Sequence, residues 1–102
     1  MRVSITARHG EIPEQLRERA EAVVARLAKL AARPTSAHVT FDVDHQRSTA
    51  EMVINAARGA VHVASADAVD HRTALDRVAA KIRRQLDKHE ARPAAARKAG
   101  RR

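Results

Sequence analysis

Apolar and polar residues alternate most regularly between residues 37 and 44. Ala37, Val39, Phe41 and Val43 each stand beside a polar residue. A period of two is typical of a strand with one buried face. Shorter alternating stretches predict further strands at residues 2–7, around 52–56 and around 60–66. A hairpin connection over residues 44–48 and a tight turn at Arg58 and Gly59 are expected between the last three strands.

Two longer segments repeat their apolar residues with the period of an α-helix. The first begins near Pro13 and runs to about Ala32, because Pro34 disfavours its continuation. Its apolar positions are Leu16, Ala20, Val23, Leu27 and Leu30. The second begins after Asp70, a suitable N-cap. Its apolar side consists of Leu75, Val78, Ala79, Ile82, Leu86 and His89.

The order of these segments is β-α-β-β-β-α, which predicts an α+β fold. We expect a four-stranded sheet with both helices packed on one face. One domain over residues 1–90 accounts for all the predicted elements. From Arg92 the pattern dissolves into alanine, proline, glycine and basic residues. We therefore expect residues 91–102 to form a basic, disordered tail.

The composition narrows the class of protein. The chain has no cysteine, so a disulfide framework and a thiolate metal site are excluded. No stretch is long and apolar enough to cross a bilayer, and no signal peptide is apparent, so the default expectation is a soluble cytoplasmic protein without a membrane partner. Phe41 is the sole aromatic residue, so stacking on splayed RNA bases has no platform.

Positive charge is segregated on the second predicted helix. Five cations recur at spacings of four, three, four and four, within a wedge of roughly 80°. They are Arg77, Lys81, Arg84, Lys88 and Arg92. The acids of the segment lie elsewhere on the helical wheel, so the row presents a field suited to an anionic partner, nucleic acid first.

The first predicted helix repeats this arrangement. Arg19, Arg26, Lys29 and Arg33 gather on one side of its apolar stripe. If the helices pack side by side, two basic rows could border one shared groove. Arg17 lies among glutamates, so an ion pair within the helix is at least as good an explanation for it.

Catalytic and metal sites are not expected. The serines lack a triad or nucleophile-elbow context, and the histidines match no common ligand spacing. Asp42 and Asp44 share one face of a strand, which an exposed polar face explains. We therefore predict no enzymatic activity, no cofactor, no metal and no small-molecule substrate.

Two motifs make the chain similar to the ribosome hibernation-promoting factors, also called ribosome-associated inhibitors. The first is Ile5-Thr6 followed by Glu11-Ile12-Pro13-Glu14-Gln15-Leu16-Arg17. The second, more specific motif is Lys81-Ile82-Arg83-Arg84-Gln85-Leu86-Asp87-Lys88-His89. Asp70 and Leu75-Asp76 also occupy positions that match the family. The resemblance covers residues 1–90 and is to the short form, which lacks the second domain of longer members.

This resemblance implies a function. Such proteins bind the small ribosomal subunit in the channel for messenger and transfer RNA, contact 16S ribosomal RNA through basic helix residues, and inhibit translation under stress. Matched position by position, the implied contacts are Arg26, Arg33, Lys81, Arg84 and Lys88. The charge pattern adds Arg8, Arg19, Lys29, Arg77 and Arg92 to the predicted RNA-binding set.

Two alternatives stay open on sequence alone. A general module that reads the shape of duplex RNA or DNA would use the same cations. A protein-interaction domain with acidic partners is a third class, although the chain has no aromatic anchors for such an interface.

Overall fold

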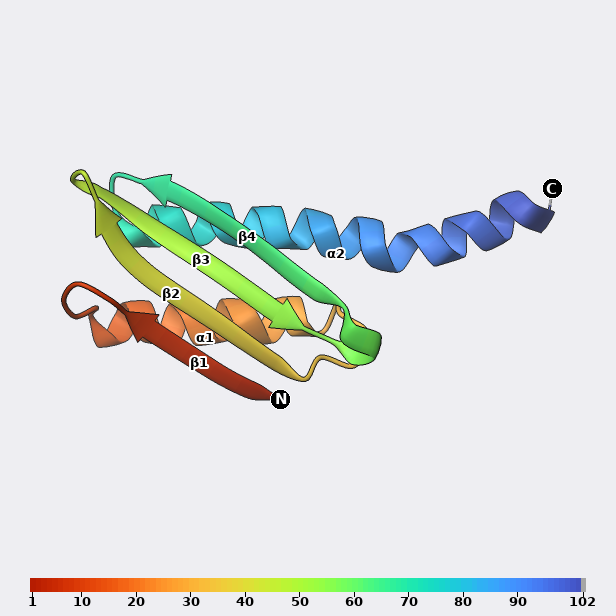
Figure 1. Cartoon of the computed structure of the whole chain (residues 1–102), viewed down its shortest axis with the longest axis horizontal. Coiled ribbons are helices and arrows are strands. Elements are labelled where there is room, and N and C mark those ends of the chain that lie inside the picture. Colours follow the sequence, from red (N-terminus) through yellow and green to blue (C-terminus); the bar gives the residue numbers. More distant parts are fainter. Residues whose placement is uncertain (102) are drawn as a thin grey trace.

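The computed structural model describes the backbone of residues 1–101 and the side chains of residues 1–88. The elements are β1 (Arg2–Ala7), α1 (Glu14–Ala28), β2 (Ser36–Asp44), β3 (Arg47–Asn55), a short 3₁₀ turn η1 (Ala57–Gly59), β4 (Val61–Ala68) and α2 (His71–Arg101). The predicted β-α-β-β-β-α order is confirmed (Figure 1).

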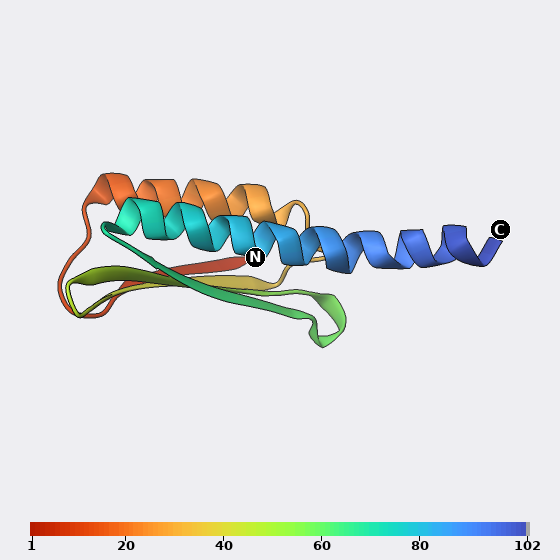
Figure 2. The same ribbon diagram turned by 90° about the horizontal axis from the view of Figure 1, so that it is seen from above.

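The strands form one mixed four-stranded sheet in the order β1-β2-β3-β4. β1 runs parallel to β2, since α1 carries the chain back between them, and the other neighbours are antiparallel. Figure 2 shows both helices on the same face of the sheet, as predicted. Within residues 1–101 no helix covers the opposite face, which we call the outer face.

The core lies between the sheet and the helices. The register places Val39, Met52 and Ala64 side by side across β2, β3 and β4. Phe41 lies two residues after Val39 on the same face of β2. Its ring packs edge-on against the ring of His71, with 5.4 Å between the ring centroids. Alanine predominates on the core face of β4, which lets α2 approach the strand closely. The helices contribute most of the predicted apolar residues, with Leu75, Val78, Ile82 and Leu86 of α2 fully buried.

The end of α1 differs from the prediction. The helix ends at Ala28 rather than near Ala32. The chain then tightens, because Leu30 and Ala31 donate to the carbonyls of Leu27 and Ala28, three residues back. Leu30 consequently leaves the core and is 39% exposed. Arg33 takes a positive φ of 52°, since Pro34 disfavours right-handed helical backbone before it.

The β2–β3 hairpin is tighter than predicted. Asp44 pairs with Arg47, so His45 and Gln46 alone form the loop. Both have positive φ, 50° and 66°, as a type I′ turn requires. β3 therefore begins at Arg47, earlier than the predicted connection over residues 44–48 allows.

The start of α2 is capped as predicted. The Thr73 backbone N–H donates to Asp70 Oδ1 at 2.7 Å. This hydrogen bond stabilises the ionised carboxylate and lowers the pKa of Asp70. The helix continues to Arg101, beyond the predicted change of pattern at Arg92. The side chains of residues 89–102, including His89 and Arg92, lie outside the described residues, so the separate basic tail stays a prediction.

Candidate nucleic-acid interface

Three side chains of α2 reach over the edge of β4. Arg77 Nη1 donates to the Asp67 carbonyl at 2.8 Å, Lys81 Nζ to that of Ser65 at 2.7 Å, and Gln85 Nε2 to that of Val63 at 2.7 Å. Four helical residues advance about 6 Å, close to the rise of two strand residues. The two elements run in opposite directions, so each step along α2 finds the next outward carbonyl of β4.

We call these three hydrogen bonds, from Arg77, Lys81 and Gln85 to β4, the strand-edge ladder. The ladder covers the exposed edge of the sheet. β4 is the last strand of the sheet, and its outward carbonyls would otherwise be open to another strand. Lys81 and Arg77 each donate one hydrogen bond to a neutral carbonyl, so neither loses its positive charge. They are thus held in position without being neutralised.

A hollow follows this edge toward the middle of α2. We call it the β4-side groove and define it by Val63, Ala64, Ser65, Lys81, Arg84, Gln85 and Lys88. None of these lining residues is acidic. Arg84 and Lys88 are exposed and form no ion pair or hydrogen bond among the described residues. The groove therefore concentrates positive charge beside a fixed strand edge.

The charge weakens toward the start of α2. Asp67 lies next to Arg77, and its carboxylate accepts a 2.7 Å hydrogen bond from Arg47 Nε. The Arg47 guanidinium holds the pKa of Asp67 below its ordinary value, with a smaller contribution from Arg77. Asp67 stays ionised near neutral pH, so the field around Arg77 is partly cancelled.

The basic residues of α1 are arranged differently. Arg19 donates to both carboxylate oxygens of Asp76, with Nη2 at 2.9 and 3.1 Å, and so joins α1 to α2. Arg26 lines a hollow between the helices together with Asp76 and Arg83. Arg17 Nη1 donates to the Ile5 carbonyl at 3.1 Å, on the β1 side of the sheet. The intrahelical alternative for Arg17 is not what the structure shows.

The structure therefore contradicts the hypothesis that the two basic rows border one shared groove. α2 turns Asp76 and Arg83 toward α1, while Arg77 and Lys81 face β4. The predicted row of α2 borders β4, whereas Arg26 of the α1 row borders the hollow between the helices, so the two rows do not line one groove. Sequence analysis missed Arg83 as a candidate, although its spacing of seven residues from Asp76 places both on one side of a helix.

Arg8 lies apart from both rows. It lines a shallow hollow on the outer face with Thr40, Asp42 and Glu51. His9 Nδ1 contacts Asp42 Oδ1 at 2.6 Å, and this hydrogen bond is the main reason that the pKa of Asp42 is lowered. Arg8 therefore faces carboxylates rather than the cations of α2.

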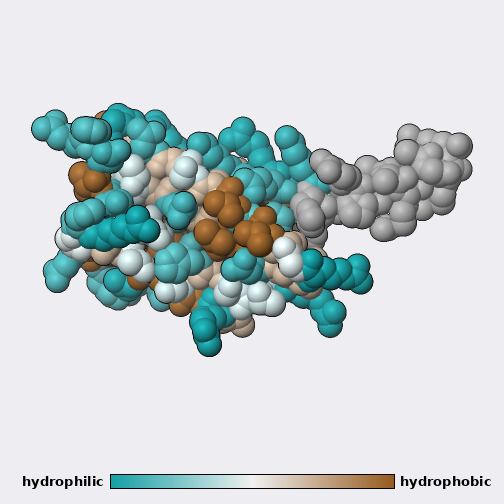
Figure 3. Space-filling model, in the orientation of Figure 1, coloured by the Kyte–Doolittle hydropathy of each residue, from teal (hydrophilic) through white to brown (hydrophobic). Residues whose placement is uncertain are grey.

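The remaining predicted cations are dispersed. Lys29 follows the last residue of α1 and is exposed. Arg33 lies at one end of the sheet, near Arg58. Figure 3 shows the outer face as mainly hydrophilic around a hydrophobic cluster. Val61 and Val63 of β4 are among the exposed large apolar residues. The outer face thus differs in character from the β4-side groove.

Residues 3–93 match the family described as Sigma 54 modulation protein / S30EA ribosomal protein. The ribosome hibernation promoting factor of Escherichia coli (strain K12) is 33% identical over 90 residues, which cover 88% of this chain and 94% of that protein. The chain belongs to this ribosome hibernation promoting factor family. The resemblance inferred from the two sequence motifs is confirmed, and the prediction of no enzymatic activity agrees with a family of ribosome-binding proteins.

Two solved structures share the fold. A ribosomal subunit interface protein from Coxiella burnetii aligns with a TM-score of 0.77 at 21% identity, over 89% of this chain and 99% of that one. The Thermus thermophilus Protein Y N-terminal domain aligns with a TM-score of 0.75 at 21% identity, over 87% and 99%. At this identity the alignments support the fold.

Among the described residues, no group of three or more histidine and acidic side chains is placed to hold a metal ion. None of the described helical stretches combines the length and the apolar character that crossing a membrane requires.

Proposed function

We propose that this chain is a ribosome hibernation factor that binds the small ribosomal subunit in its messenger and transfer RNA channel and inhibits translation there. In this proposal it contacts 16S ribosomal RNA and works in the cytoplasm, where ribosomes translate. Membership of the family supports the ribosome as partner. The observation that carries the proposal is the acid-free β4-side groove, lined by three cations of the second motif: Lys81, Arg84 and Lys88.

The four cations of α2 are expected to contribute unequally to RNA binding. Arg84 and Lys88 have no described acidic partner, so their full charge is available for phosphate oxygens. Lys81 is held by the Ser65 carbonyl and retains two N–H donors, so little side-chain entropy remains to be lost on binding. Arg77 is held in the same way but lies beside Asp67, so we assign it a smaller contribution.

The cations of α1, together with Arg83 of α2, form a secondary set in this proposal. Arg26 and the additional residue Arg83 border the hollow between the helices and can contact a second stretch of backbone. Arg19 is largely neutralised by Asp76, so its direct contribution is expected to be small. Inhibition then follows from occupancy, because a folded domain in the channel excludes messenger and transfer RNA.

Co-sedimentation of the full chain with separated subunits and intact ribosomes tests the proposal. We expect retention on the small subunit and on intact ribosomes, and loss of retention when initiator transfer RNA fills the channel. Excess bulk duplex RNA serves as the control for the general duplex-binding alternative. Retention that duplex RNA removes and initiator transfer RNA leaves unchanged would refute the channel assignment.

A further inference from the structure

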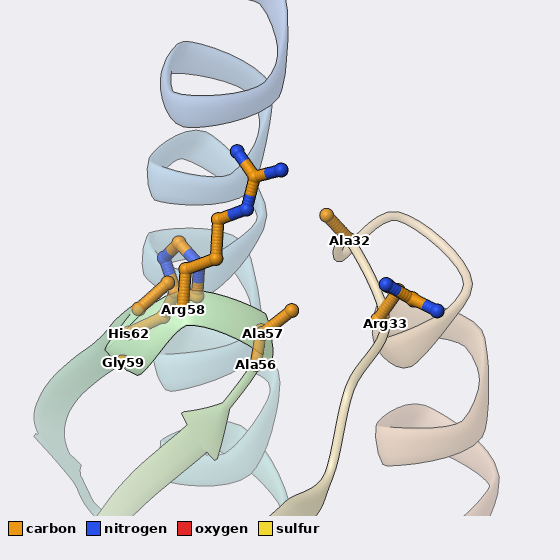
Figure 4. A pocket seen from close by; sticks show the side chains of 8 residues that line it. Ala32, Arg33, Ala56, Ala57, Arg58, Gly59 and His62 are labelled. Carbon is orange, nitrogen blue, oxygen red and sulfur yellow. The ribbon is translucent and has the colours of Figure 1, made fainter.

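A second cavity lies at the end of the sheet, away from the residues assigned to ribosome binding on α2. Its walls are the segment after α1, at Ala32 and Arg33, and the turn around η1, residues 56–60 (Figure 4). The Ala57 backbone N–H donates to the Ala32 carbonyl at 3.2 Å and ties the two walls together. The volume is about 510 Å³, within the usual range for small-ligand sites.

Two arginines flank this cavity from different loops. Figure 4 shows Arg58 on the η1 side and Arg33 on the α1 side. Both have left-handed backbone, with φ of 63° and 52°, a conformation that long side chains rarely adopt. Non-glycine residues held in this region often occur at functional sites. Glycine would fit either backbone position better, so the fold alone does not explain arginine at both.

The chemistry of the lining favours an anion with an apolar part. None of the residues lining the cavity is acidic, and neither arginine forms an ion pair among the described residues. The short side chains of Ala56, Ala57 and Ala60 leave an apolar surface, and His62, which is 4% exposed, also lines the cavity. Guanidinium groups bind phosphate through paired donors and stack on planar rings.

We propose that this cavity binds a nucleoside phosphate, with Arg33 and Arg58 on the phosphate and the base against the alanine surface. The nucleotide is either free or part of an RNA strand, since the chemistry is the same. Arg33 is also one of the RNA contacts that the family resemblance implies, so the proposal rests on the proposed function where the nucleotide belongs to RNA and is independent of it where the nucleotide is free.

Titration of the full chain, followed by backbone amide NMR signals, tests the proposal with adenosine monophosphate, adenosine, inorganic phosphate and a short oligoadenylate. A free-nucleotide site predicts saturable shifts of the Ala57 and Ala60 amides with the monophosphate, at a Kd below about 1 mM, and weaker binding of adenosine or phosphate alone. A site for RNA predicts saturation at these amides by the oligonucleotide only.

The variant Arg33→Gly/Arg58→Gly removes both guanidinium groups while suiting the positive φ values, so its thermal stability should not fall. We expect its affinity to drop about tenfold or more. Arg2→Gly/Arg72→Gly removes the same charge elsewhere and should bind as the original chain does. If no probe shifts the cavity amides, or if both variants bind equally, the proposal is wrong.

A second comparison separates this proposal from the ribosome-binding one. Arg84→Glu/Lys88→Glu should lose ribosome binding but keep nucleotide binding to within about threefold, because neither residue lines the cavity. Equal loss of both activities would show that the cavity has no binding site of its own.

Discussion

The two helices carry similar basic residues but hold them in different ways. On α1, Arg19 is paired with the carboxylate of Asp76. On α2, Arg77 and Lys81 are paired with neutral carbonyls of β4, and Arg84 and Lys88 lack an acidic partner among the described residues. A carboxylate fixes a cation and cancels its charge, whereas a carbonyl fixes the cation and leaves its charge in place. The partner of each cation therefore matters as much as its position.

The largest effect expected from this difference is on salt dependence. If about six phosphates are neutralised, binding to the small subunit should weaken on the order of a thousandfold between 50 and 200 mM salt. Equilibrium binding over this range gives the slope. Arg84→Gln/Lys88→Gln should lower the slope by about two, while Arg19→Gln should leave it nearly unchanged. A flat dependence for the original chain would exclude phosphate binding as the main interaction.

Charge reversal in the β4-side groove comes next. Arg84→Glu/Lys88→Glu should reduce affinity for the small subunit about a hundredfold or more, because two attractive contacts become repulsive. Its circular dichroism and thermal midpoint should match those of the original chain, since both side chains are exposed. Arg2→Glu/Arg72→Glu changes the net charge equally outside the groove and should retain most of the binding. Similar losses in both variants would mean that total charge, rather than the groove, determines affinity.

Gln85 allows the structural effect of the strand-edge ladder to be measured separately from the effect of its positive charge, because Gln85 is neutral. Gln85→Ala removes a neutral cap and should cost about 1 kcal/mol of unfolding free energy without changing the salt slope. Lys81→Met should lose a similar hydrogen bond and also lower the slope by about one. Urea denaturation and salt-dependent binding of both variants measure the two effects. If Gln85→Ala also lowered the slope of the salt dependence, the ladder's role in stability could not be separated from the role of its charge in binding.

Breaking the ion pair between Arg19 of α1 and Asp76 of α2 should have a smaller effect on affinity, and in the opposite direction. Asp76→Ala releases Arg19, so affinity for the small subunit should rise a few-fold, by about 0.5–1 kcal/mol of electrostatic attraction. The pair is partly exposed, so its loss should cost no more than about 1 kcal/mol of stability. Arg19→Ala in the same background is the control and should abolish the gain.

The smallest effect concerns acid stability. The pKa values of Asp42 and Asp70 are lowered in the folded chain, mainly by hydrogen bonds from His9 and from Thr73. A lowered folded-state pKa contributes stability above the unfolded pKa, and this contribution disappears as the pH falls below about 4. Asp70→Asn should therefore reduce the difference in unfolding free energy between pH 6 and pH 3. Urea midpoints at the two pH values provide the measurement, and an unchanged difference would contradict the assignment.

Local patterns in the sequence determined most of the fold. The strands, both amphipathic helices and the Asp70 cap each depend on residues close together in the chain, so periodicity predicts them. The end of α1 and the β2–β3 turn were misplaced because they depend on backbone choices at Arg33, His45 and Gln46 that side-chain patterns do not encode.

For the site, the sequence by itself identified the cations of α2 and, through the motif around Lys81, the family. Only the tertiary structure decided what lies beside each cation. Arg19 is paired with Asp76, and Arg77 and Lys81 are bonded to the edge of β4. Arg33 lies beside Arg58 in the cavity at the end of the sheet. These partners lie on separate elements, and their distances are set by how the helices dock on the sheet. A helical wheel gives the direction of a side chain but not what lies in that direction, which is why the predicted shared groove did not form.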